Sequence, residues 1–239
     1  MLLILMSLIG LPVGVVLYAL IERLATKPYS GEDEDEDTDS PAVSAAPSIH
    51  GEAGALLIAH DGVWRRRAIV IVATSALFAT ATARYENPIE LAIISAYICA
   101  LLICAATDLL TYRVPNVVTY PAILGAIAVA ALMPDANFYA ALSGGLLAGG
   151  VLLLPAIFTG GAGMGMGDVK LALFVGLAVG FQLVPIALLV MALGGGLVAA
   201  TLLVSGGRKR GEPIPYAPFI SAGALVALLG AGASFTGLS

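Results

Sequence analysis

The amino-acid sequence predicts an all-α membrane protein, a polytopic bundle of about eight transmembrane helices. Its 239 residues are 59% hydrophobic and only 11% charged, whereas a soluble domain has about 25% charged residues. The apolar residues form repeated runs close to the ~20 residues that a helix needs to cross a membrane. The basic residues gather in alternate connections, as expected of loops that stay on one side of a membrane.

The apolar runs, separated by short polar connections, define the expected helices in order. The apolar block over residues 169–204 is too long for one crossing. We divide it at VGFQLVP, where Gly180, Gln182 and Pro185 favour a turn. Six or seven crossings with re-entrant segments are the alternatives to eight. The expected helices cover residues 2–22, 67–84, 89–107, 117–133, 138–158, 169–181, 183–204 and 216–236.

Composition divides the chain into three parts. Residues 1–27 form a first transmembrane helix that is retained, because its charges follow the apolar run and do not precede it as in a secretory signal. Residues 28–66 hold seven of the sixteen acidic residues in the run GEDEDEDTDS, together with His50 and His60. This polar composition predicts a disordered acidic cytoplasmic linker. Residues 67–239 form the transmembrane core.

Positive charge predicts the orientation of the helices. With eight crossings, every basic residue except Arg84 lies on one side of the membrane, which the positive-inside rule makes cytoplasmic. Both chain termini are then external. The basic residues on the cytoplasmic side are Arg23, Lys27, Arg65, Arg66, Arg67, Arg113, Lys170, Arg208, Lys209 and Arg210.

Two acidic residues stand apart from those in the linker and the external turns. Asp108 ends the third expected helix and Asp168 opens the sixth, so the predicted topology places both at the cytoplasmic face. A carboxylate at the membrane boundary is costly and often functional. The structural alternative is a helix-end anchor, which suits Asp168 because an acid in the first turn complements the helix dipole. It suits Asp108 less well, because a negative charge at a helix C-terminus opposes the dipole.

If the two aspartates meet, they form a pair that shares one proton, because two like charges a few Å apart do not both ionise easily. One carboxylate then activates water while the other donates a hydrogen bond to a scissile carbonyl. Glycines before Asp168 allow an extended substrate to approach, although a simple flexible loop is the alternative. These glycines are Gly160, Gly161, Gly163, Gly165 and Gly167.

Other catalytic chemistries lack their motifs. The sequence has no GxSxG and no HExxH, and GAGMGMGD has neither the surrounding βαβ unit of a dinucleotide site nor the GK[ST] ending of a phosphate loop. Cys99 and Cys104 are five residues apart within one apolar run, a spacing that favours inert thiols over a metal site or a disulfide.

Three stretches resemble the type IV prepilin peptidases, membrane aspartic proteases of the GxGD type. They are TDLLTYRVPN around Asp108, GMGDVKLA around Asp168, and EPIPYAPFISAGALVAL before and within the last expected helix. A weaker fourth similarity is LIGLPVGVVLYALIERL, which looks like the opening helix of that family.

The resemblance implies an aspartic endopeptidase of the cell inner (cytoplasmic) membrane that removes the short basic leader of prepilins or pseudopilins at the cytoplasmic face. It implies that Asp108 and Asp168 are the catalytic pair. It assigns loop-shaping positions to Gly165 and Gly167, and structural or substrate-orienting positions to Lys170, Pro115 and Asn116. The expected partners are these substrates and the lipid bilayer, with no nucleic acid.

The sequence departs from the full-length pattern of the family after the first helix. Many members carry two CxxC pairs there and also N-methylate the new N-terminus, whereas residues 28–66 contain no cysteine. We therefore expect no zinc and no cofactor, and predict the peptidase activity alone, with methylation as an alternative. A small transporter or channel lined by the aspartates and a catalytically silent assembly subunit are the competing interpretations.

Overall fold

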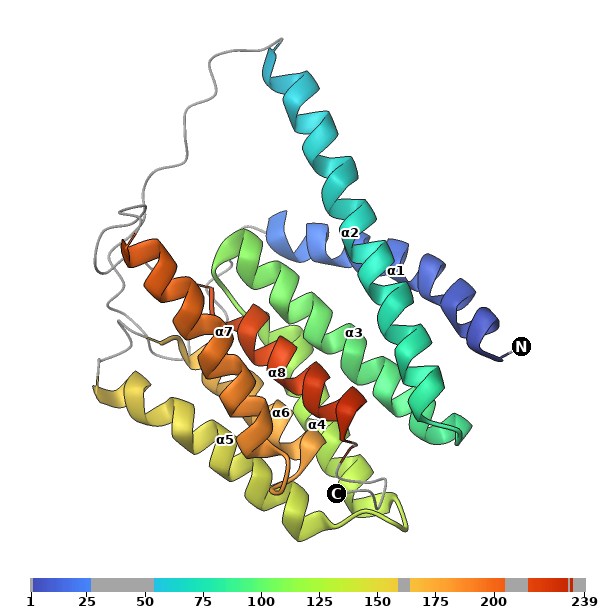
Figure 1. The fold of residues 1–239 in the computed structure, drawn as a ribbon, viewed down its shortest axis with the longest axis vertical. Coiled ribbons are helices and arrows are strands. Elements are labelled where there is room, and N and C mark those ends of the chain that lie inside the picture. Colours follow the sequence, from blue (N-terminus) through green and yellow to red (C-terminus); the bar gives the residue numbers. More distant parts are fainter. Residues whose placement is uncertain (1, 27–53, 159–163, 205–214, 232, 234–239) are drawn as a thin grey trace. The chain divides into compact units, whose positions relative to one another are not determined.

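The computed structural model describes residues 2–26, 54–158, 164–204, 215–231 and 233, and these residues form helices without any strand (Figure 1). The predicted all-α fold is confirmed. The chain divides within α2 into two compact units, Met1–Ala79 and Thr80–Ser239. The helices are α1 (Leu2–Thr26), α2 (Gly54–Arg84), α3 (Pro88–Thr111), α4 (Asn116–Leu132), α5 (Phe138–Phe158), α6 (Met166–Val179), α7 (Val184–Val204) and α8 (Ala217–Gly230).

The start of α2 differs from the sequence-based expectation. The helix begins at Gly54, although the expected linker extended to residue 66. The first residues of the helix, GALLIA, are mostly strong helix formers. Acidic and polar residues dominate the average composition of residues 28–66, so this composition did not predict a helix at Gly54. The rest of the expected linker, residues 28–53, lies outside the described residues.

The expected division of the long apolar block is confirmed. Helix α6 ends at Val179 and α7 begins at Val184. Between them Gly180 has a φ of 78° and a ψ of 163°, a combination essentially restricted to glycine. The next residue, Phe181, donates its N–H to the carbonyl of Ala140 at 2.8 Å. This turn is therefore attached to the start of α5.

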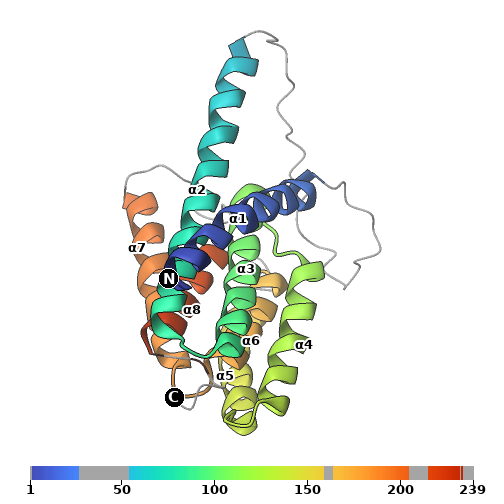
Figure 2. The ribbon, with the colours of Figure 1, turned by 90° about the vertical axis from the view of Figure 1, so that its right-hand side faces the viewer.

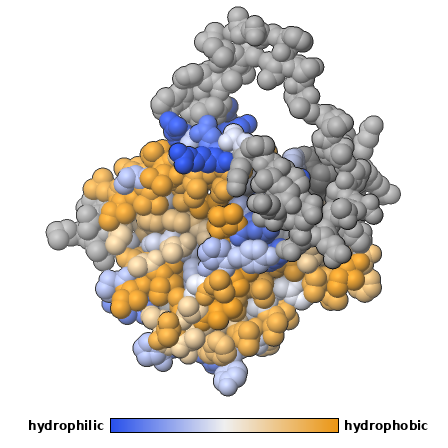
Figure 3. Space-filling model, turned by 180° about the vertical axis from the view of Figure 1, so that it is seen from behind, coloured by the Kyte–Doolittle hydropathy of each residue, from blue (hydrophilic) through white to orange (hydrophobic). Residues whose placement is uncertain are grey.

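Several helices have the length and surface of membrane-spanning segments. In the described part of the chain, five are long and apolar enough to cross a membrane: Leu8–Thr26, Arg65–Arg84, Pro88–Thr111, Phe138–Phe158 and Val184–Thr201. Hydrophobic residues cover most of the coloured surface in Figure 3, and large apolar side chains are widely exposed. In water an apolar surface of this extent favours aggregation, whereas in a bilayer it is the surface expected to face the lipid. The chain is thus a multi-pass membrane protein, and crossing by the shorter helices α4, α6 and α8 stays a prediction.

In the first unit, two small residues of α1 allow it to pack closely on α2. A Cβ added at Gly10 would lie 2.7 Å from Ser75 Cα, and one at Gly14 would lie 2.8 Å from Ile71 Cα. Close approach through small residues is typical of helix pairs in membranes, where dispersion contacts replace the hydrophobic effect.

In the second unit, α6 is the central helix. It packs against α4, α5, α7 and α8, and its residues from Asp168 to Val179 are buried except Lys170 and Leu173 (Figures 1 and 2). The closest approach is to α5, where a Cβ on Gly176 would lie 2.8 Å from Gly145 Cα and would also strike the carbonyl of Gly144. Glycines on both helices therefore set how deeply α6 is inserted.

We predict that Gly176→Ala lowers the stability of the protein. The added methyl group meets backbone atoms of α5 that cannot move aside, so the helices must separate, at a cost of about 1–3 kcal/mol. Thermal unfolding in detergent micelles measures the effect. Gly150→Ala on α5 is the matched control, because a Cβ there meets nothing within 4 Å and alanine has the higher helix propensity. Equal unfolding midpoints for the two variants would contradict the close-packing account.

Candidate active site

Asp108 lies in the last turn of α3 and is buried, with 4% of its surface exposed. The helix ends at Thr111 because Tyr112 adopts the left-handed conformation, with a φ of 55°, and donates its N–H to the Asp108 carbonyl at 2.8 Å. Pro115 follows and becomes the N-cap of α4. The short connection between the two helices thus leaves the Asp108 side chain at one end of the bundle.

Asp168 lies in the first turn of α6, three residues after the N-cap Gly165, and is 9% exposed. Its N–H donates to the Gly165 carbonyl at 3.1 Å. This is the helix-end position expected from the sequence, where a carboxylate complements the helix dipole. Helix capping alone does not explain its burial, because an acid that only caps a helix has no need to leave solvent.

The fold brings the two aspartates to the same region. Helix α8 packs on both α3 and α6, and the N–H of Ala217, its first residue, donates to Oδ2 of Asp108 at 3.0 Å in a buried hydrogen bond. This contact offsets the unfavourable position of Asp108 at the C-terminal end of α3. It was missed by sequence reasoning, and the only signal was Pro218 in YAP, which is typical of a helix start.

Burial and the charge of Asp108 both disfavour the ionised form of Asp168. Helix α6 has 14 residues and is not among the five spanning segments. Burial, and to a smaller extent the negative charge of Asp108, together raise the pKa of Asp168 to about 7, whereas a hydrogen bond from the Gly165 backbone opposes the shift. Oδ1 of Asp168 is buried and has no hydrogen-bond partner in the described part of the protein. The arrangement suits a pair that holds one proton near neutral pH.

Lys170 and Asn116 are also brought together. Lys170 Nζ donates to Asn116 Oδ1 at 3.4 Å and lies 4.9 Å from the centre of the Tyr120 ring. These contacts join α6 to the first turns of α4. Tyr120 was not anticipated, because an aromatic residue one turn into an apolar helix gives no signal that distinguishes it from a lipid-facing side chain.

The two motif glycines have different surroundings. A Cβ on Gly167 would lie 3.0 Å from Val114 Cβ, so glycine lets the start of α6 approach the connection between α3 and α4. A Cβ on Gly165 would lie 3.9 Å from Asp168 Oδ2, at an exposed position. Gly160, Gly161 and Gly163 lie outside the described residues.

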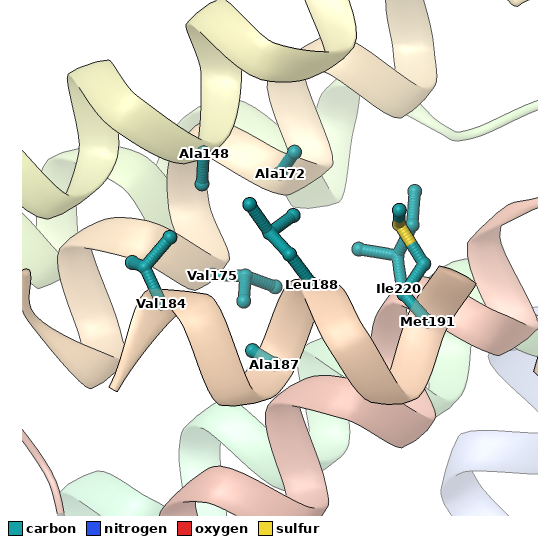
Figure 4. A pocket seen from close by; sticks show the side chains of 8 residues that line it. All are labelled: Ala148, Ala172, Val175, Val184, Ala187, Leu188, Met191 and Ile220. Atoms are coloured by element: carbon teal, nitrogen blue, oxygen red, sulfur yellow. The ribbon is translucent and has the colours of Figure 1, made fainter. Parts of the chain in front are cut away.

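Two other features of the described residues were candidates for an alternative site, a metal cluster and a pocket. No three His, Cys, Asp or Glu side chains gather there as metal ligands. The pocket in Figure 4 is a small apolar hollow between α5, α6, α7 and α8. It contains neither aspartate and no polar side chain, so it has no group for acid–base chemistry. Its lining residues are Ala148, Ala172, Val175, Val184, Ala187, Leu188, Met191 and Ile220.

The described residues thus form a multi-pass helical membrane protein with two buried aspartates at one end of its second unit. Residues 95–200, which contain both, match the model of the Type IV leader peptidase family. The resemblance predicted from the sequence is thereby confirmed, and the family supports the prediction of a peptidase.

Several curated proteins are similar to this chain, and they share one name, "Prepilin leader peptidase/N-methyltransferase". The Bacillus subtilis protein is 33% identical over 158 residues, which are 65% of this chain and 62% of the relative. The Burkholderia pseudomallei protein is 30% identical over 168 residues, 68% of this chain and 54% of the relative. The Pseudomonas aeruginosa protein is 34% identical over 120 residues, 48% and 41% of the two chains. The chain therefore spans less than two thirds of these relatives. No solved structure matches it significantly.

We predict that Asp168→Asn stabilises the folded protein, and that the gain grows with pH. Because the pKa of the folded state is raised from 3.8 to about 7, the unfolded chain releases this proton first and wild-type stability falls as pH rises between those values. The variant lacks this penalty, so its gain is small near pH 4 and reaches on the order of 2–4 kcal/mol above pH 7. Thermal unfolding in micelles at several pH values tests this. Asp135→Asn, at an exposed turn, is the control, and the same pH dependence in both variants would refute the account.

Proposed function

We propose that the protein is a membrane aspartic endopeptidase that removes the leader peptide of type IV prepilins or pseudopilins, with Asp108 and Asp168 activating water. One observation carries the proposal. The fold brings two aspartates that are 60 positions apart in sequence to one buried end of the bundle, where the charge of one affects the ionisation of the other. Both lie inside the segment that matches the peptidase family.

The proposed reaction requires only one proton on the pair. The ionised carboxylate takes a proton from water as the water oxygen bonds to the scissile carbonyl carbon, and the protonated carboxyl group gives its proton to the carbonyl oxygen. The resulting diol collapses when the leaving nitrogen receives a proton from the first carboxyl group and the C–N bond breaks. A hydroxyl proton returns to the second carboxylate, so the pair again holds one proton and the products are an acid and an amine.

The residues around the two aspartates have contacts that support this proposed reaction. Oδ1 of Asp168 is a buried acceptor without a partner in the described residues, and a water molecule or substrate carbonyl is the natural ligand for such an atom. Gly165 is exposed beside the Asp168 carboxyl group and leaves room for an extended backbone. The contact of Lys170 with Asn116 and Tyr120 ties α4 to α6 and orients the helix that carries Asp168. Pro115, Asn116, Gly167 and Lys170 are therefore proposed as structural positions.

The substrate class and location are inferred from the relatives. Their name specifies a prepilin leader, and we propose the same class for this chain, with cleavage at the cytoplasmic face of the inner membrane. The name also includes N-methyltransferase, but the described residues offer no feature that favours this second activity. A transporter or channel is the competing function, and it would tolerate Asp→Glu better than a peptidase whose two carboxyl groups must keep their geometry.

We predict that Asp108→Asn and Asp168→Asn each abolish leader cleavage, with a loss of at least ~10³-fold, because an amide can neither accept the water proton nor hold the shared one. The assay is the gel shift of a prepilin co-expressed in membranes, with Asp135→Asn as the control. Normal cleavage by either variant, at wild-type expression, would remove that aspartate from the mechanism and favour the transport function.

We predict that the aspartate end of the bundle faces the cytoplasm. In a background with Cys99→Ala and Cys104→Ala, Tyr112→Cys marks the exposed connection after α3, and Asp135→Cys marks the exposed turn after α4. A membrane-impermeant maleimide should label Tyr112→Cys only in inverted vesicles and Asp135→Cys only in right-side-out vesicles. The opposite pattern would invert the topology, and labelling of both from one side would show that α4 does not cross.

A further inference from the structure

The first peptide group of α8 makes a contact that helix formation does not require. The N–H groups in the first turn of a helix have no intrahelical acceptor. Tyr216 is the N-cap of α8, and Ala217, its first residue, is fully buried. Its N–H donates to Asp108 Oδ2 at 3.0 Å, away from solvent. The donor is a backbone group. Its position is set by the packing of α8 on α3, and the hydrogen bond itself does not depend on the side chain of Ala217.

The two carboxyl groups differ in how they are hydrogen-bonded. Asp108 accepts a buried N–H from the first residue of α8, and this hydrogen bond favours the ionised form, against the dipole of α3 at whose C-terminal end Asp108 lies. Asp168 also lies at a helix start, but its Oδ1 is buried without a partner in the part of the chain that the structure describes. A carboxylate oxygen that is buried and unpaired favours the neutral form, in agreement with the raised pKa of this group.

We propose that the Ala217 N–H is a positioning group that keeps Asp108 ionised, so that Asp108 accepts the water proton and Asp168 carries the proton of the pair. This inference rests on the proposed peptidase function and assigns the roles that the sequence left open. Asp168 then gives its proton to the carbonyl oxygen of the substrate. The assignment follows from the hydrogen bonds and not from the order of the residues in the chain.

The elements that carry the pair, or pack against them, hold other ionisable side chains among the described residues. They include Cys104 on α3, Arg113 after it, Tyr120 on α4, Lys170 on α6 and Tyr216 at the start of α8. Asp108 and Asp168 are the carboxyl groups that the described residues place at this end of α3, α4, α6 and α8.

The first variant removes the N–H of residue 217 and keeps every side chain. Translation with a suppressor tRNA replaces Ala217 by its α-hydroxy acid, lactic acid, so that an ester oxygen takes the place of the N–H. The matched control replaces Ile220 by its α-hydroxy acid, because the Ile220 N–H donates within the helix, to the Tyr216 carbonyl at 3.1 Å. Ala217→Pro is the second variant without this N–H, since proline is accepted at the first position of a helix. The readout is kcat/KM for cleavage of a prepilin between pH 5 and pH 8.

We expect the acidic limb of the pH profile to move upward by about one pH unit in the Ala217 ester and in Ala217→Pro, with activity at the acidic end about tenfold lower. The Ile220 ester should keep the acidic limb of the unmodified protein. A uniform loss of activity at all pH values, or an unmoved limb in both Ala217 variants, would overturn the inference. Failure of the unmodified protein to cleave the prepilin would instead overturn the proposed function, so the two failures are distinguishable.

Discussion

The burial of two carboxyl groups at one end of an apolar bundle is the constraint on which the arrangement of the second unit depends. A buried charge is tolerated only with hydrogen bonds or an opposite charge nearby. Asp108 lies where its own helix dipole is unfavourable, and the peptide N–H that compensates for this comes from α8, 109 residues further along the chain. This hydrogen bond therefore links the C-terminal end of α3 to the start of α8.

The glycine contacts between α5 and α6 complete this arrangement. Helix α6 has 14 residues and is enclosed by its neighbours, so it presents Asp168 at the interior end of the bundle and not at its surface. Gly176 allows the backbones of α5 and α6 to touch, and the turn at Gly180 is hydrogen-bonded to α5. The position of Asp168 relative to Asp108 is thus set by contacts along the full length of α6, far from the carboxyl group itself.

The family comparison and the structure cover different parts of the site. The family match extends over residues 95–200 and includes both aspartates, Asn116 and Lys170. It ends before α8, and so it does not include the Ala217 peptide group that contacts Asp108. A stability penalty at Asp168 is consistent with a functional site, because proteins keep unfavourable buried groups mainly where chemistry requires them.

The sequence by itself predicted the order and approximate positions of the helices that the structure describes, because short polar connections separate the apolar runs. It predicted the division near Gly180 correctly, since only glycine adopts the backbone conformation found there. It also singled out Asp108 and Asp168, because carboxylates are rare at the ends of apolar helices. The early start of α2 escaped prediction, because a short run of helix formers is lost in the average composition of a polar segment.

Only the tertiary structure decided how the aspartates are held. The donor to Asp108 is a backbone N–H, and every residue except proline has one, so no residue type marks it in the sequence. The contact of Lys170 with Tyr120 likewise follows from packing between helices, as does the burial of Asp168 Oδ1 without a partner among the described residues. The sequence thus singles out the two carboxyl groups that we propose carry the chemistry, whereas the difference in their hydrogen bonds arises from backbone groups placed by the fold.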